Sequence, residues 1–276
     1  MLTRNEEIER SIITKFRKVI WRPFTKAIKE YELIKENDKI AVCISGGKDS
    51  MLMAKCLEEL KKHGKIKFDL VYLVMNPGYN KKNIEKIKEN AKTLCIDIQM
   101  FNSNIFEIVN QEKSSPCYLC ARMRRGCLYK KAQELGCNKI ALGHHFDDVI
   151  ETIMMSIMYG GEYKSMPPKL RSKNYSGMEL IRPLYLVRED DIISWSEYNK
   201  LSFINCACKF TEKSKKDTTN SKRLAMKYLI KQLKEENKMV EYNIFASSLN
   251  VNINTVLGLK TDKEKKNFLD IYNNNN

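Results

Sequence analysis

Short apolar runs alternate with stretches of helical periodicity through residues 39–159. The apolar runs predict buried strands at residues 39–44, 68–75, 97–101 and 139–142. Between them, apolar residues recur at helical spacing, which predicts helices at about 48–62, 80–94, 117–135 and 147–159. Strands that alternate with helices form βαβ units, in which helices cover both faces of a parallel sheet. We therefore expect an α/β fold with a doubly wound, mostly parallel sheet.

The segments on either side of this alternation predict helical extensions. Residues 1–37 are expected to form a helical lead-in that packs on the main domain, because Ile12, Phe16, Ile20 and Phe24 recur at four-residue steps. The main domain is expected to span 38–210 and to end with a loop at 160–177, an extended segment at 179–186 and a helix at 188–199. Residues 211–276 are expected to be a basic helical extension, with a helix at 222–233 and a frayed asparagine tail.

The first predicted strand runs directly into Ser45-Gly46-Gly47-Lys48-Asp49-Ser50. A strand, a glycine turn and a helix N-terminus together form an anion site, because free N–H groups and the helix dipole point at the ligand. Ligands of such sheets bind at the carboxyl ends of the strands. The glycine loop after the first strand and Gly143-His144-His145 after the fourth are therefore expected at this edge. The pattern predicts a phosphate-binding site at this edge.

The charge balance indicates a polyanionic partner. The chain carries 49 basic and 34 acidic residues, a net charge of +15, although a lysine-rich composition would also produce an excess. Arg122, Arg124 and Arg125 are less easily explained by composition, because they cluster. No apolar run reaches the length of a membrane span and the N-terminus lacks the apolar core of a secretory signal, so we expect a cytoplasmic protein with no membrane contact.

Two groups of cysteines stand out among the nine in the chain. Cys117 and Cys120 form a C-x-x-C, and Cys206 and Cys208 form a C-x-C about ninety residues later. An odd number of cysteines without a secretory signal does not indicate a disulfide framework, so a shared metal site is the better interpretation. The spacing alone does not distinguish zinc from an iron–sulfur cluster.

Longer motifs connect the chain to a known family. The loop matches the SGG-x-DS signature of the PP-loop ATP pyrophosphatases, which have an adenine nucleotide α-hydrolase-like fold. From about residue 15 to residue 240 the chain resembles the tRNA 2-thiocytidine synthetase family. That resemblance rests on Cys117-Tyr-Leu-Cys-Ala-Arg-Met-Arg-Arg-Gly126, Ala141-Leu-Gly-His-His-Phe-Asp-Asp148, Tyr159-Gly-Gly, Met166-Pro-Pro-Lys-Leu170, Ile181-Arg-Pro-Leu184 and Val187-Arg-Glu189.

The resemblance implies an enzyme that thiolates tRNA. It would adenylate the C2 oxygen of a cytidine at position 32, in the anticodon loop, and replace that oxygen with sulfur. ATP would be split to AMP and pyrophosphate, and a [4Fe-4S] cluster would be held by three cysteines. Cys117 and Cys120 match two of these ligands, and the third is Cys206 or, alternatively, Cys208, because the family's Pro-Cys-x-x-Cys element is shorter here. The resemblance also suggests a cysteine desulfurase as the sulfur donor and a homodimer.

The remaining assignments follow from the same motifs. Lys48 and the loop amides would neutralise phosphate charge, and Asp49, Asp147 and Asp148 would hold Mg²⁺ or move a proton. An Asp-Asp pair that opens a helix also caps it, which is the structural alternative for the last two. The expected ATP-binding residues are Ser45, Gly46, Gly47, Lys48, Asp49, Ser50, Met75, Gly143 and His144. The expected RNA-binding residues are Arg122, Arg124, Arg125, Lys169, Arg182 and Arg188.

Other functions remain open at this point. One is a PP-loop enzyme that acts on another tRNA base, such as a 2-thiouridine synthetase or a lysidine synthetase. A different class is an iron–sulfur sensing protein that binds RNA and has no ATP turnover. The lysidine synthetases lack the cysteine pair, and the complete Ser45–Ser50 loop argues against a silent ATP site.

Overall fold

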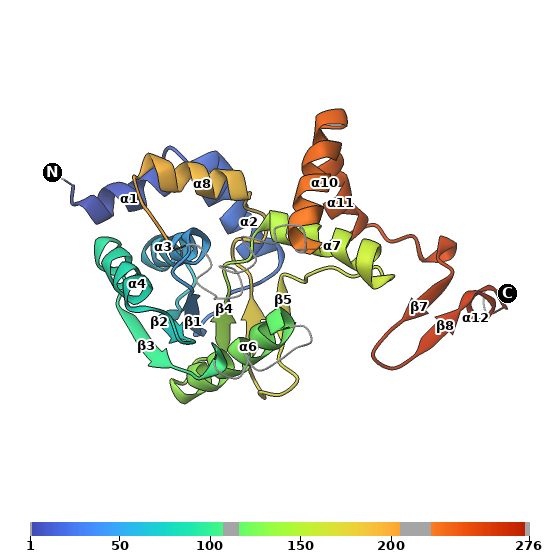
Figure 1. Cartoon of the computed structure of the whole chain (residues 1–276), viewed down its shortest axis with the longest axis horizontal. Helices are drawn as coiled ribbons and strands as arrows, with labels where there is room; N and C mark the ends of the chain where they lie inside the picture. The colour runs from blue at the N-terminus through green and yellow to red at the C-terminus, as the bar shows by residue number, and fades with distance from the viewer. Residues whose placement is uncertain (1, 107–115, 205–221, 274–276) are drawn as a thin grey trace.

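The core of the fold is a six-stranded sheet with the strand order β3-β2-β1-β4-β6-β5. The computed structural model describes residues 2–106, 116–204 and 222–273, without the side chains of residues 116–118. Strands β1 to β4 and β6 pair in parallel, and only β5 pairs antiparallel. The strands are β1 (Lys39–Ile44), β2 (Asp69–Asn76), β3 (Ile98–Asn102), β4 (Lys139–Ala141), β5 (Lys169–Arg171) and β6 (Glu179–Ile181). The predicted mostly parallel α/β fold is confirmed (Figure 1).

Helices cover both faces of this sheet. The side chains of Ile40, Val42 and Ile44 belong to one apolar cluster, and the alternating Ala41 and Cys43 belong to another. Because successive strand residues point to opposite faces, each cluster lies on its own face of the sheet. Helices α3, α4, α7 and α8 contribute to the first cluster and α6 to the second. These helices are α3 (Lys48–His63), α4 (Lys81–Thr93), α6 (Pro116–Glu134), α7 (Phe146–Gly160) and α8 (Glu189–Tyr198).

The edge of the sheet departs from the prediction. Strand β5 lies inside residues 160–177, which were expected to be a loop, because its three residues are too few and too polar for a clear apolar pattern. The extended segment expected at 179–186 contains a strand only over Glu179–Ile181. Beyond it the chain turns, with the Tyr185 N–H donating to the Arg182 carbonyl at 3.1 Å. Pro183 has no N–H to continue a ladder, and Leu184 and Tyr185 are buried in the turn that contains them.

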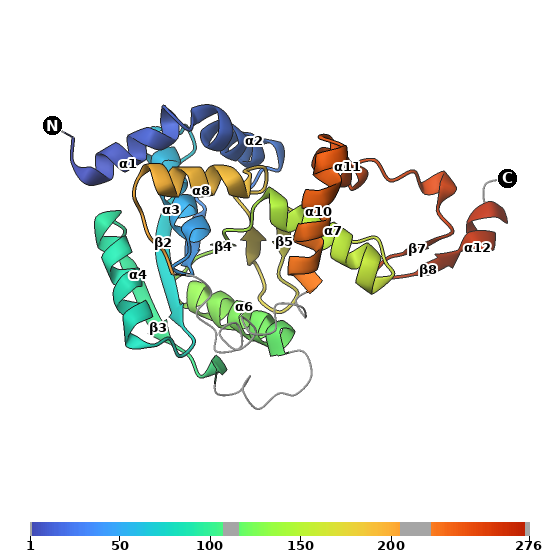
Figure 2. The same cartoon turned by 45° about the horizontal axis from the view of Figure 1, so that its top comes forward.

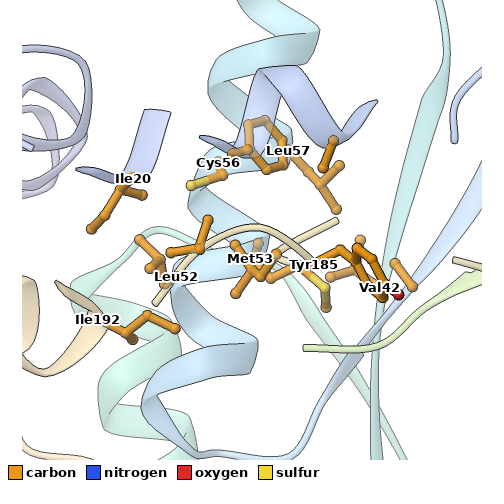
Figure 3. Close-up of a cluster of buried hydrophobic side chains, with 14 of the residues drawn as sticks. Ile20, Val42, Leu52, Met53, Cys56, Leu57, Tyr185 and Ile192 are labelled. Carbon is orange, nitrogen blue, oxygen red and sulfur yellow. The ribbon is translucent and has the colours of Figure 1, made fainter. Parts of the chain in front are cut away.

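The N-terminal residues pack on the sheet domain as predicted. They form α1 (Arg4–Ile13), a π-helical turn η1 (Arg17–Trp21) and α2 (Arg22–Glu30). The predicted stripe is buried, with at most 6% of any side chain exposed: Ile12, Phe16, Ile20 and Phe24. Figure 3 shows Ile20 beside Leu52 of α3 and Ile192 of α8. The π-helical turn precedes Pro23, which cannot donate the hydrogen bond that a continuous α-helix would require there.

The buried side chain of Lys55 connects this lead-in to α3. Its ammonium is 2.6 Å from Glu9 of α1 and 2.9 Å from the Leu94 carbonyl, and it also pairs with Glu58. Glu9 pairs in turn with Lys62 at 2.8 Å. A buried charge requires such partners, because an uncompensated one carries a large desolvation cost.

The C-terminal region contains more than the predicted helix. It comprises α10 (Lys222–Glu236), α11 (Val240–Ser247), a 3₁₀ turn η3 (Ile253–Thr255), the hairpin β7 (Gly258–Lys260) and β8 (Lys265–Asn267), and α12 (Phe268–Asn273). Helices α10 and α11 pack on α7, whereas the hairpin projects away from the sheet domain (Figure 2). No residue of 249–273 is buried. Within the described ranges, none of the helices combines the length and the apolar character needed to cross a bilayer.

Candidate active site

The turn between β1 and α3 requires a glycine at its first position. Gly46 has φ +86°, and a Cβ there would lie 2.6 Å from Ile87 Cγ1 and 2.8 Å from Ile204 Cδ1. The Gly46 carbonyl also accepts a hydrogen bond from the Ile204 N–H at 3.3 Å. The turn is therefore held between α4 and the segment that follows α8, with no room for a side chain.

Hydroxyl groups fix the shape of the same loop. The Ser50 hydroxyl accepts from the Ser45 N–H at 3.1 Å and donates to the Gly47 carbonyl at 3.0 Å. The Ser45 hydroxyl accepts from the Gly47 N–H at 3.3 Å. These contacts set the N-terminus of the sixteen-residue helix α3 facing the carboxyl ends of the strands.

A pocket of about 340 Å³ adjoins this loop. It lies beyond the carboxyl ends of β1, β2 and β4, where the sheet rule places ligands. Helix α6 forms a further wall through Ala121, Arg124, Arg125 and Leu128. Of the residues predicted from the sequence, the pocket brings together Ser45, Asp49, Ser50, Met75, Arg124, Arg125, Gly143, His144 and Asp148. Those that the sequence did not single out are Cys43, Ile44, Ala121, Leu128 and Leu142, whose apolar pattern indicated only core positions.

The loop after β4 touches the start of α3. A Cβ on Gly143 would lie 3.0 Å from the Ser50 nitrogen and 3.1 Å from the Asp49 carbonyl carbon. This close approach allows His144 and Asp148 to share a pocket with the phosphate loop. A larger residue at position 143 would force the two loops apart.

The two histidines after Gly143 have different environments. His144 lines the pocket, and burial together with the Arg182 charge lowers its pKa to about 4, so its imidazole is neutral at pH 7. Its Nδ1 is buried and has no hydrogen-bond partner among the residues that the structure describes. His145 is also buried, and its Nε2 lies 3.5 Å from Asp148 and 4.0 Å from Asp49. His145 therefore connects the two pocket carboxylates, which the sequence pattern did not indicate.

Asp147 and Asp148 both lie near His145 but differ in their other partners. Asp147 does not line the pocket; its carboxylate accepts from the Glu189 N–H at 2.7 Å and from Arg188 Nη2 at 3.1 Å. It thus caps α8. Asp148 accepts from the His145 N–H at 3.1 Å and lies 3.3 Å from Arg223. Burial raises the pKa of Asp148, but the charges of His145 and Arg223 outweigh burial and lower it overall.

Helix α10 completes the charge balance around the site. Lys48 does not line the pocket, because its ammonium pairs with Glu189 at 3.0 Å and with Asp49 at 3.1 Å. Glu189 also pairs with Lys227 of α10. Arg223 lies 3.4 Å from the buried Glu151 of α7. The basic face expected on α10 therefore packs partly against acidic groups, a long-range pairing that local sequence does not reveal.

Replacing Glu189 by glutamine is expected to destabilise the protein at neutral pH by about 2 kcal/mol. Burial raises the pKa of Glu189, but hydrogen bonds from Lys227 and Lys48 outweigh burial and lower it to about 2. A carboxylate with a lowered pKa stabilises the fold above its unfolded pKa of 4.5, and the stabilisation is lost as the pH falls toward 2.

Urea unfolding of wild type and Glu189→Gln between pH 7 and pH 2 measures this effect. The difference in unfolding free energy should shrink as the pH falls below about 4.5. Glu85→Gln, an exposed change on α4, is the control and should show no such pH dependence. A pH-independent difference for Glu189→Gln would contradict the expectation.

The predicted metal-binding cysteines lie only partly within the described residues. Cys117 and Cys120 belong to the first turns of α6, and Cys120 packs against Met75 and Ile105. Cys206 and Cys208 lie outside the described residues. In the described part of the chain, no three His, Cys, Asp or Glu side chains form a group that could hold a metal. Cys43 lines the pocket, but burial raises the pKa of its thiol to about 12, so it remains protonated.

The predicted RNA-binding residues do not form one surface. Arg124 lines the pocket and donates to the Tyr79 hydroxyl at 3.2 Å, and Arg125 lines it from the exposed side of α6. Arg182 is buried and donates to the Pro167 carbonyl. Arg188 pairs with Asp147 and Glu241, and Lys169 donates to the Glu32 carbonyl at 3.3 Å.

Comparison with known proteins agrees with this architecture. The PP-loop domain family matches residues 16–216. The tRNA-cytidine(32) 2-sulfurtransferase of Citrifermentans bemidjiense is 35% identical over 229 residues, which cover 82% of this chain and 88% of that protein. The protein of the same name from Aeromonas hydrophila is 41% identical over 204 residues, covering 72% of this chain and 66% of its own length.

A solved structure is similar over most of the fold. The U34-tRNA thiolase NcsA from Methanococcus maripaludis, solved with its [4Fe-4S] cluster, aligns with a TM-score of 0.67 and 26% identity. The alignment covers 84% of this chain and 78% of that one. The chain therefore belongs to the PP-loop family and, within it, to the group of proteins named tRNA-cytidine(32) 2-sulfurtransferases.

Proposed function

We propose that this protein is an ATP-dependent tRNA sulfurtransferase that converts cytidine 32 of tRNA to 2-thiocytidine. The observation that carries the proposal is the double role of α6. This helix contains the C-x-x-C pair in its first turns, and its next turns form a wall of the pocket beside the phosphate loop. Nucleotide activation and sulfur delivery could therefore take place in one space. The names of the related proteins support the substrate, and the thiolase NcsA supports the chemistry.

The chemistry requires activation of a poor electrophile. The C2 oxygen of cytosine would attack the α-phosphorus of ATP, the bond to the β-phosphate bridging oxygen would break, and pyrophosphate would leave. Sulfide would then add at C2, and the oxygen would depart as part of AMP. Sulfur that arrives as a persulfide would first need two electrons from a thiol reductant to reach the sulfide level. Donors fixed in place before the reaction stabilise the charge that develops on the phosphates. The α3 N-terminus, Arg124 and Arg125 are the donors at the pocket, and Lys48 lies next to Asp49, paired with it and with Glu189.

The acidic and imidazole groups of the pocket have complementary tasks. Asp49 and Asp148 supply carboxylate oxygens, the ligand type that Mg²⁺ prefers. His144 presents a neutral imidazole whose Nδ1 is free to hydrogen-bond a ligand, as far as the described residues extend. It is suited to orient a ligand group by a hydrogen bond in its neutral form, because burial and the Arg182 charge disfavour its protonation. Asp147 would act indirectly by fixing α8 and Arg188.

The cysteines fit an iron–sulfur cluster. Thiolates are the ligands of such clusters, and residues at i and i+3 of a helix lie on the same face, as do Cys117 and Cys120. Ile204 is hydrogen-bonded to Gly46, and the sequence continues within two residues to Cys206, the favoured third ligand, with Cys208 the alternative. Cys117, Cys120 and Cys206 would hold the cluster, which would supply a binding place for sulfur beside the pocket. A cysteine desulfurase would supply that sulfur.

The direct test is mass spectrometry of tRNA nucleosides from a deletion strain and from the complemented strain. Loss of 2-thiocytidine alone, restored by complementation, is the expected result. NcsA acts on U34, so a uridine target is the second candidate. Persistence of 2-thiocytidine with loss of a 2-thiouridine would favour that candidate, and no change in any thionucleoside would overturn both.

Asp49→Ala is expected to abolish RNA-dependent pyrophosphate release while leaving the iron content unchanged. The carboxylate lies in the first turn of α3, where it lines the pocket, and it is not one of the residues expected to hold iron. A coupled pyrophosphate assay and an iron assay on the same preparation measure both properties. Asp97→Ala, an exposed change before β3, is the control. Retained pyrophosphate release in Asp49→Ala would remove this residue from the mechanism.

A further inference from the structure

A second pocket lies next to the first one along α6. It has a volume of about 300 Å³ and is formed by α6 together with residues 170–175, which begin in β5 (α6 and β5 are labelled in Figure 1). Its lining includes four cationic side chains, and none of the lining residues is acidic: Arg122, Arg125, Arg171 and Lys173. A pocket with this composition selects for a polyanion.

The walls of this basic pocket are fixed to one another. The Tyr175 hydroxyl donates to the Gly126 carbonyl at 3.0 Å, and the Tyr175 ring stacks on Tyr129 with centroids 5.2 Å apart. The Tyr175 N–H donates to the Ser172 hydroxyl at 3.1 Å, which closes the turn after β5. The cations on α6 and those on the turn are therefore held at a defined separation.

The cations of the basic pocket are available to a ligand. Arg122 and Arg125 are exposed, and neither forms an ion pair with any of the described residues. Arg171 is 92% exposed and only 3.7 Å from Glu179, and Lys173 pairs with Asp262 on the surface at 2.6 Å. Exposed ion pairs of this kind contribute little to stability, so a phosphate group can take the place of the carboxylates.

The two pockets share a wall. Ala121 and Arg125 are one helical turn apart on α6 and line both of them. A nucleotide chain with one base in the first pocket would therefore continue past Arg125 into the basic pocket. We propose that the basic pocket binds backbone phosphates of the RNA strand next to the nucleotide that is modified. The inference takes its substrate class, RNA, from the proposed function. It assigns Arg122 to RNA binding, whereas Arg124 lines the pocket beside the phosphate loop.

A salt titration of RNA binding tests this inference. The probe is an unmodified anticodon stem-loop transcript, and fluorescence anisotropy is measured from low to moderate salt for the wild type and Arg122→Gln/Arg171→Gln. Each phosphate contact to a single strand contributes about 0.7 to the slope of log affinity against log salt. The double variant should lose about 1.4 from that slope and bind about tenfold more weakly at low salt, with ATP affinity unchanged.

The matched control removes the same charge elsewhere. Lys92→Gln/Lys130→Gln changes two exposed lysines on α4 and α6 that line neither pocket. Equal slopes for the two double variants would overturn the inference, as would an absence of RNA binding by the wild type. The assay needs no turnover, so it is independent of the nucleoside test. Wild-type protein that shows the arginine-dependent slope but leaves cytidine unmodified would contradict the proposed function alone.

Discussion

Gly46→Ala is expected to reduce pyrophosphate release to background while the protein remains folded. The positive φ of Gly46 disfavours any side chain by about 1–2 kcal/mol. In addition, the new methyl group would overlap Ile87 and Ile204 at 2.6–2.9 Å. Relief of that overlap must shift the two isoleucine side chains or the loop itself. The strained φ adds to the pressure on the loop, and a displacement of about 1 Å at a reacting group can cost on the order of 100-fold in rate. The coupled pyrophosphate assay with tRNA and circular dichroism of the same samples measure the two properties.

Gly136→Ala is the control variant, because it introduces backbone strain without a steric overlap at the phosphate loop. Gly136 also has a positive φ, +70°, but a Cβ there would meet only the end of the Lys39 side chain at 3.9 Å. It lies at the end of α6, outside the pocket. This variant should lose about 1 kcal/mol of stability and keep its pyrophosphate release. Comparable activity in both variants would show that the close packing around Gly46 does not control catalysis.

Cys117→Ser is expected to eliminate both thiolation and bound iron, with the fold intact. Its position in the first turn of α6 puts it one turn from Cys120 and ahead of the arginines that line the nucleotide pocket. A serine hydroxyl preserves the size of the side chain but is a poor ligand for iron, so cluster assembly should fail. Iron content, the visible absorbance of anaerobically reconstituted protein and 2-thiocytidine formation measure the effect.

Cys95→Ser is the matched control, because Cys95 is exposed and lies between α4 and β3, away from the pocket. It should retain iron and thiolation. The same assays on Cys206→Ser and Cys208→Ser identify the third ligand as the one whose loss removes iron. Thiolation by Cys117→Ser at the wild-type rate would contradict the cluster assignment.

The sequence predicted the sheet and the centre of the site for a physical reason. Parallel strands buried on both faces read as continuous apolar runs, so β1 and β2 were evident. The residues that follow each strand then had to meet at one edge of the sheet. Ser45–Ser50 and Gly143-His144 were expected at that edge, and the structure brings most of them into one pocket. Met75, expected there from the family resemblance, lines the same pocket.

The parts that the sequence did not predict depend on long-range contacts. Nothing in the local pattern distinguishes Asp147, which caps α8, from Asp148, which faces the pocket. The pairing of Lys48 with Glu189 joins residues 141 positions apart, and Lys227 adds a third segment. The short edge strand β5 and the β7–β8 hairpin are too polar to give an alternating signal. Tertiary pairing alone determines these features.

The contact of Lys55 with Glu9 affects where a functional fragment of this protein can begin. A fragment starting at Asp38 would keep every strand and the complete phosphate loop. It would nevertheless remove one of the two carboxylates that pair with a fully buried ammonium, and it would uncover the core around Ile20 and Phe24. Breaking a buried ion pair costs about 3–5 kcal/mol, a large share of the roughly 5–15 kcal/mol that stabilises a domain. The minimal folding unit therefore includes the N-terminal helices, although they contribute no residue to the pocket.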